Sequence, residues 1–150
     1  MSNEINRILK QFADLQHGES WIGNNFKQVL HGITAATASR AFNEDTNSIW
    51  SLIAHLIYWR TTVANRLGGT NDKPTFQDFH LPEEMSDENW KQTLIDFEAS
   101  YHILRNSLLH LKPENIDKPS PVERQSFYDV IIGCLQHDAY HLGQIALLKK

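Results

Sequence analysis

The spacing of apolar residues along the chain is that of amphipathic helices. The clearest run alternates steps of four and three over residues 90–111, which is typical of the buried seam of a helix bundle. Its members are Trp90, Leu94, Phe97, Tyr101, Leu104, Leu108 and Leu111. Ser86 is a suitable N-cap before this run, and Pro113 follows it. The pattern therefore predicts a long helix between these two residues.

Three further segments show the helical period. Residues 2–16 carry apolar side chains at steps of three and four, and a shorter helical piece is expected over residues 21–33, after the interruption at Gly18. A broad apolar face over residues 49–67 ends at the glycine pair 68–69, which predicts a second long helix. The last helix begins after Ser126, where Asp129 forms a weaker relative of a capping box, and it closes at Lys149 and Lys150.

Long connections separate these helices. Residues 69–85 contain Gly69, Pro74 and Pro82 among polar residues, and at ~3.4 Å per extended residue they can run back along a long helix. The chain shows no strand-like alternation and no internal repeat. We therefore predict an all-α four-helix bundle in which residues 1–150 form one domain. The linker would allow the second and third long helices to run parallel, but the pattern leaves their topology open.

Composition narrows the function classes. The 150 residues are 41% hydrophobic and 21% charged, with a net charge of -4 and no basic cluster, so we expect no nucleic-acid partner. No apolar run reaches the ~18 residues of a membrane span, and the amino terminus lacks the pattern of a secretory signal. These features predict no membrane association and a cytoplasmic location. With Cys134 as the single cysteine, a metal would be held mainly by His, Asp or Glu.

His137 and His141 lie four residues apart on one face of the last helix, so both imidazoles can reach one metal ion at ~2.0–2.2 Å. Such pairs also occur by chance on solvated helix faces. These two border an apolar face rather than bulk water. That face is centred on Phe127, Ile131, Cys134, Leu142 and Ile145.

His55 occupies the equivalent edge of the second long helix. Its polar neighbours are Ser51, Tyr58 and Thr62, and the facing edge of the last helix carries His137, Tyr140, His141 and Gln144. If the two edges meet, three imidazoles converge and leave coordination positions open. Neutral imidazole favours zinc, nickel or iron over calcium or magnesium. The alternative for His55 is a partly buried histidine bonded to a carbonyl.

Two other polar groups project into the apolar face of the last helix. Asp138 needs a partner if it is buried, and this partner is either a ligand histidine N–H or a structural donor from Trp, Tyr or Arg. Cys134 is expected to be an inert buried thiol, with metal ligation as a minor alternative. The remaining histidines are expected to be solvated, capping or linking residues. They are His17, His31, His80, His102 and His110.

Three segments carry a recognisable pattern, namely SIWSLIAHLIYW at 48–59, GCLQHDAYHLGQIALLKK at 133–150 and WIGNNF at 21–26. With these segments the chain resembles the DinB-like superfamily, also described as YfiT-like. It implies a four-helix bundle of up-down-down-up topology that holds a divalent metal through His55, His137 and His141. It also implies a bacterial protein and makes a homodimer a reasonable expectation.

The resemblance leads to competing functions. The first is a thiol S-transferase that joins a bacillithiol- or mycothiol-type thiol to a small electrophile, with zinc, nickel, iron or manganese in the site. Tyr58, Tyr140 and Gln144 are candidates for positioning the substrate. The second is a metal-dependent hydrolase, for which Asp138 is the only carboxylate close in sequence. The others are a non-catalytic metal-containing binding or stress protein, and a helical interaction domain with three unrelated histidines.

Overall fold

The computed structural model describes residues 3–150, and it is all-helical, as predicted. Outside the helices, these residues form a single isolated β-bridge between Pro119 and Ser126. In chain order the elements are α1 (Glu4–Gln16), α2 (Phe26–Leu30), α3 (Ala35–Ser39), α4 (Ile49–Leu67), α5 (Asp87–His110), the 3-10 turn η1 (Pro113–Asn115) and α6 (Phe127–Leu148).

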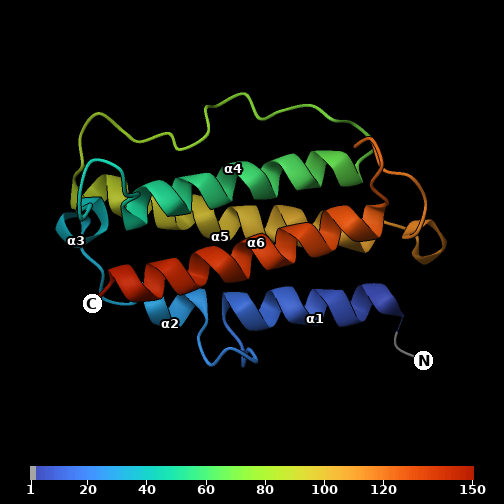
Figure 1. The fold of residues 1–150 in the computed structure, drawn as a ribbon, viewed down its shortest axis with the longest axis horizontal. Coiled ribbons are helices and arrows are strands. Elements are labelled where there is room, and N and C mark those ends of the chain that lie inside the picture. Colours follow the sequence, from blue (N-terminus) through green and yellow to red (C-terminus); the bar gives the residue numbers. More distant parts are fainter. Residues whose placement is uncertain (1–2) are drawn as a thin grey trace.

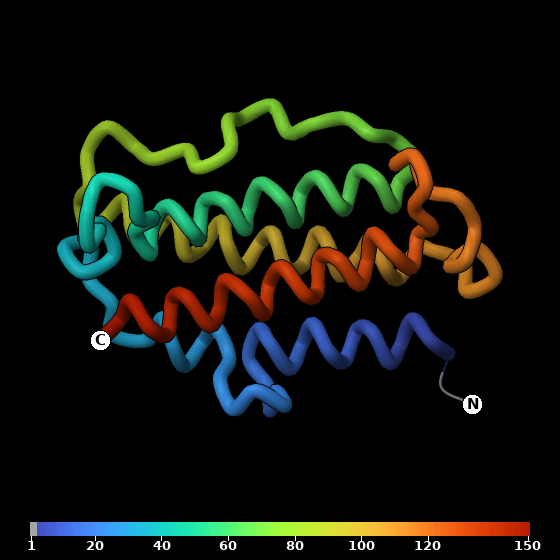
Figure 2. The backbone as a smooth tube through the Cα atoms, viewed as in Figure 1, coloured from blue at the N-terminus to red at the C-terminus, as the bar shows by residue number. Residues whose placement is uncertain are grey.

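The four long helices are aligned along one axis, and the short α2 and α3 lie toward one end (Figure 1). α4 packs against both α5 and α6, and α1 also contacts both α5 and α6. In Figures 1 and 2, α4 and α5 run in one direction while α1 and α6 run in the other. The linker between α4 and α5 makes this possible, because it returns along the outer side of α4 (Figure 2). α4 and α6 therefore lie next to each other and run antiparallel.

Serine side chains cap the start of α4, α5 and α6. Ser48 begins α4 and Ser86 begins α5, each accepting a hydrogen bond from the backbone N–H three residues on. At α6, Ser126 and Asp129 form a complete reciprocal capping box, so the shorter aspartate does reach back to the cap. These caps set the register in which the histidines face one another.

The core has two clusters, which lie toward opposite ends of the bundle. One contains Trp50 and Trp90, whose ring centroids lie 5.1 Å apart. The other contains Leu104 and Ile131. Among the described residues, no helix is long and apolar enough to cross a membrane.

The segment after α1 differs from the prediction of a helical piece over residues 21–33. Trp21 is fully exposed, and α2 begins only at Phe26. The reason is local, because Asn25 caps α2 by accepting the Gln28 N–H at 2.8 Å, and Gly23 has a φ of +80° that ends any helix before it.

Candidate metal centre

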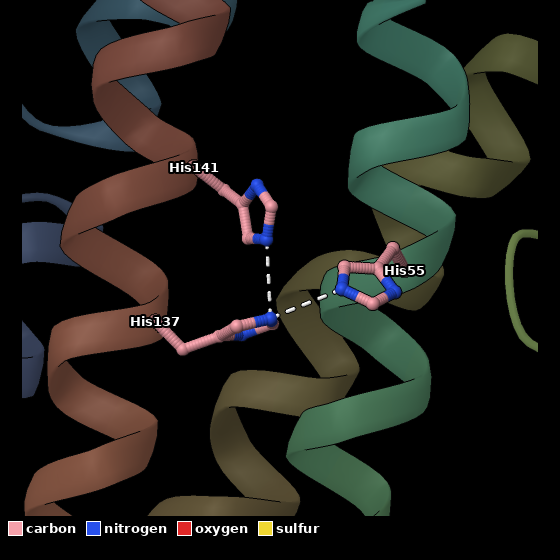
Figure 3. Close-up of side chains that lie close together, drawn as sticks. All are labelled: His55, His137 and His141. Carbon is pink, nitrogen blue, oxygen red and sulfur yellow. Dashed lines mark hydrogen bonds between the residues drawn. The ribbon is translucent and has the colours of Figure 1, made fainter. Parts of the chain in front are cut away.

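Three histidines from α4 and α6 point their Nε2 atoms toward one another (Figure 3). The His137 Nε2 lies 3.0 Å from the His55 Nε2 and 3.1 Å from the His141 Nε2. All three candidate ligand atoms lie within 4.8 Å of one another. The helix spacing brings His137 and His141 together, and the antiparallel contact of α4 with α6 adds His55.

The linker holds the outer side of His55. The Asp78 Oδ1 lies 2.7 Å from the His55 Nδ1, and the Phe79 ring stacks on the imidazole with centroids 4.0 Å apart. A carboxylate can only accept a hydrogen bond, so the His55 Nδ1 carries the proton. The lone pair of the Nε2 then faces the other two histidines.

Gln144 plays the corresponding part for His141. Its Oε1 lies 2.6 Å from the His141 Nδ1, one helical turn along α6. The amide oxygen accepts the Nδ1–H, so the lone pair of the His141 Nε2 also points inward. Acceptors on their outer sides thus prepare two of the three imidazoles as ligands, an arrangement common around metal-bound histidines.

Hydrogen bonding among the three rings alone leaves the cluster incompletely satisfied. The His137 Nε2 faces two inward lone pairs, and as a neutral imidazole it can donate one proton to one of them. A cation at the centre would accept all three lone pairs. Nitrogen ligands at about 2.0–2.1 Å around a tetrahedral ion lie roughly 3.3 Å apart, close to the separations of His137 from its two neighbours. The donor set therefore fits a divalent metal ion.

The surroundings favour the neutral form of the histidines on α6. Burial, together with the neighbouring His141 and His55, lowers the pKa of His137 to about 4. Burial also lowers the pKa of His141, although the hydrogen bond to Gln144 opposes this shift. At neutral pH both rings are thus neutral, which is the protonation state in which an imidazole binds a metal.

Asp138 lies outside the histidine cluster. Its carboxylate is fully buried and accepts hydrogen bonds from the Arg60 guanidinium, at 2.9 Å from Nη2 and 3.1 Å from Nε. Of the two sequence alternatives, the structure supports the structural donor. The Arg60 charge meets the need of the buried carboxylate for a partner, which leaves Asp138 committed to the core.

The remaining candidates, Tyr140, Tyr58 and Cys134, lie around the histidine cluster without a hydrogen bond to it. The Tyr140 ring lies 5.1 Å from that of His141 and is 64% exposed, so it can approach a molecule bound there. Tyr58 packs on Trp59 and on Phe76 of the linker. Cys134 is buried, and burial raises the pKa of its thiol well above the usual value, as expected for an inert thiol.

A groove of about 390 Å³ opens beside the histidines, between α4 and α6. His55 and His137 form one end of it, and Trp59 and Arg66 line the α4 side. Its volume is within the range of small-molecule pockets. A larger hollow of about 490 Å³ lies between α4, α5 and the linker, but none of the three histidines lines it.

Sequence reasoning missed Asp78 and Phe79. Both belong to the linker, which has no helical period, so no spacing rule connects either residue to His55. An acidic residue followed by an aromatic one inside a polar connection was the only signal available, and it is a weak one.

The fold and the site define an all-helical protein with a three-histidine cluster that could hold a metal ion. The family model of the DinB superfamily matches residues 20–145, so the chain belongs to this superfamily, which is metal-binding. The match covers α2 to α6 up to Ile145 and includes all three histidines. Among curated proteins and solved structures, no match to the chain was found.

Proposed function

We propose that His55, His137 and His141 hold a divalent metal ion in a bundle of up-down-down-up topology, and that the protein is a metal-dependent thiol S-transferase. The observation that carries this proposal is the convergence of three Nε2 atoms, two of them oriented by Asp78 and Gln144, at the end of a groove. Zinc, nickel, iron and manganese all suit three imidazoles. The homodimer implied by the family resemblance stays a prediction.

A divalent ion bound there would favour the thiolate form of a substrate thiol at neutral pH. The protein's own residues prepare the site for that chemistry. Asp78 and Gln144 each accept an Nδ1–H and keep the imidazoles in the ligand tautomer. Phe79 covers one face of His55 and limits the access of water. Tyr140, exposed to solvent beside His141, is available to orient the electrophile.

Hydrolysis has weaker support because it would benefit from a general base next to the attacking water. Asp138 is paired with Arg60 in the core, and Asp129, which lines the groove, accepts two hydrogen bonds from Ser126. Asp78 is bonded to the Nδ1 of His55, on the opposite side of the ring from the Nε2 atoms. Each of these three carboxylates is thus already engaged by another group of the protein.

Metal analysis of protein purified without a histidine tag tests the site. We expect one ion per chain in the wild type, and loss of that ion in His55→Ala and in His141→Ala. His102→Ala is the matched control, because His102 is exposed on α5 and pairs with Glu98, away from the three histidines. Metal content well below one ion per chain in the wild type, unchanged by the first two substitutions, would exclude the three-histidine site.

Turnover is tested separately on metal-loaded protein. A panel of low-molecular-weight bacterial thiols is incubated with small electrophiles, and the conjugates are measured by mass spectrometry. We expect conjugation that requires both the metal and His55. Metal binding without conjugation across a broad panel would favour a non-catalytic binding role.

A further inference from the structure

The lining of the groove between α4 and α6 includes a glycine inside a helix. Gly133 precedes His137 by one turn on the same face of α6, and it lines the groove. A Cβ atom at Gly133 would meet nothing within 4 Å. Alanine in a helix interior is more stable than glycine by about 1 kcal/mol. Packing therefore does not require glycine here, whereas a side chain would project into the groove.

The opposite wall offers a flat ring and a positive charge. The Trp59 ring centroid lies 6.3 Å from that of His55 and 6.1 Å from that of His137. The Arg66 guanidinium carbon lies 5.5 Å from the Trp59 centroid. These distances place the guanidinium at most about 12 Å from the His137 ring. Histidines, indole and guanidinium thus follow one another along the groove.

Arg66 has guanidinium N–H groups that can donate hydrogen bonds to a ligand. Its Nε donates to the Asn71 Oδ1 at 3.0 Å, and within residues 3–150 its guanidinium forms no ion pair. Asp129 lines the same groove, but its Oδ2 accepts both the backbone N–H and the hydroxyl of Ser126 at 2.8 Å. The Asp129 carboxylate is committed to the start of α6, and its charge would direct an anion toward the α4 wall. A guanidinium with free N–H groups is well suited to a carboxylate.

We propose that this groove binds an elongated small molecule with an apolar or planar body and one carboxylate, which Arg66 binds while the other end reaches His55 and His137 of the histidine cluster. Trp59 supports the body of the molecule, and Gly133 leaves room for it. This inference rests on the proposed function in one respect, since it takes the end at the histidines as the reacting end. It assigns the class of substrate, an anionic thiol, that the site accepts.

The test uses ω-mercaptooctanoate and its neutral counterpart ω-mercaptooctanol, each titrated into the full-length protein loaded with cobalt(II). Chemical shifts of the Trp59 indole N–H report occupancy of the groove, and the thiolate-to-cobalt absorption band reports the thiol at the metal. We expect the acid to bind more tightly than the alcohol. Arg66→Gln should weaken the acid by about ten- to a hundredfold and change the alcohol less than about twofold.

Two glycine variants separate blocking of the groove from a general effect on α6. Gly133→Leu should abolish binding of both probes. Gly143→Leu is the matched control, because Gly143 is also exposed in α6 and has nothing within 4 Å of an added Cβ, but it lies outside the groove. Circular dichroism and thermal unfolding establish that each variant folds.

The outcomes distinguish this inference from the proposed function. Equal binding of acid and alcohol, an equal effect of Arg66→Gln on both, or equal effects of the two glycine variants would overturn the groove assignment. An Arg66-dependent indole shift without the thiolate band would retain the groove and overturn the thiol chemistry. The thiolate-to-cobalt band without a preference for the acid would retain the thiol chemistry and overturn the groove assignment.

Discussion

At the scale of single residues, the site depends on which nitrogen of each imidazole carries its proton. His55 and His141 each meet an acceptor on the outer side, Asp78 in one case and Gln144 in the other. The acceptors differ in charge, because Asp78 offers a carboxylate where Gln144 offers an amide oxygen. The Asp78 side chain is thus a positioning group that acts on the metal through His55.

Asp78→Asn tests this role. The amide keeps the size of the side chain but removes its charge. It can also turn its NH2 group instead of its oxygen toward the His55 Nδ1, so an acceptor is no longer ensured there. We expect the affinity for zinc to fall by about ten- to a hundredfold, measured by competition with a chromophoric chelator. Asp72→Asn, an exposed aspartate in the same linker, is the control. Equal zinc affinities for the two variants would show that Asp78 does not support the site.

The residue scale is also where the sequence was least informative. The i, i+4 spacing of His137 and His141 was visible in the sequence, and so was the edge position of His55. The contact between Asp78 and His55 spans 23 residues and depends on the path of an irregular linker. Phe79 stacks on His55 from a backbone with φ of +55°, a conformation that no pattern of residue types marks for phenylalanine.

At the scale of elements, α6 serves the site and the core at once. One of its edges carries His137 and His141, while the next position, Asp138, turns inward to Arg60 of α4. Both members of this ion pair are about 1% exposed, and the guanidinium also lies 4.3 Å from the Phe97 ring centroid. The pair joins α4 to α6 directly behind the histidines, so it fixes the separation of the two helices at the site.

Asp138→Leu should destabilise the fold strongly. The substitution leaves the Arg60 charge buried without its partner, and breaking a buried pair in this way costs about 3–5 kcal/mol. Urea unfolding of metal-free protein measures the change. The double variant Arg60→Met with Asp138→Leu should recover most of the loss, because no buried charge remains. A loss below about 1 kcal/mol in Asp138→Leu would contradict a structural role for the pair.

The long helices could be predicted because each has many apolar positions in phase and a recognisable cap or stop. For α4, the sequence indicated 49–67 with a stop at the glycine pair, and the structure has Ile49–Leu67. For α5, Ser86 is the cap in both. The short α2 and α3 could not be predicted in this way, because five residues contain little more than one helical period. Their starts depend on the caps Asn25 and Thr34 rather than on a repeating face.

At the scale of the whole molecule, the bundle joins two parts of the chain that are distant in sequence. His55 and His137 are 82 residues apart, and the α4–α5 linker, α5 and η1 all lie between them. The all-helical class was predictable because helical patterning is local. The meeting of α4 with α6 was an expectation only, because patterning does not determine which helix edges face each other.

An ion shared by His55 and His137 would act as a cross-link that turns the chain between them into a closed ring. In the chain-entropy description used for disulfides, closing a loop of this size stabilises the fold by about 4–5 kcal/mol. The ring contains α5 and the linker, whereas α1, α2 and α3 lie outside it. Metal should therefore slow amide hydrogen exchange in α5 far more than in α1. Equal slowing in both helices would show that the ion stabilises the bundle without acting as a ring closure.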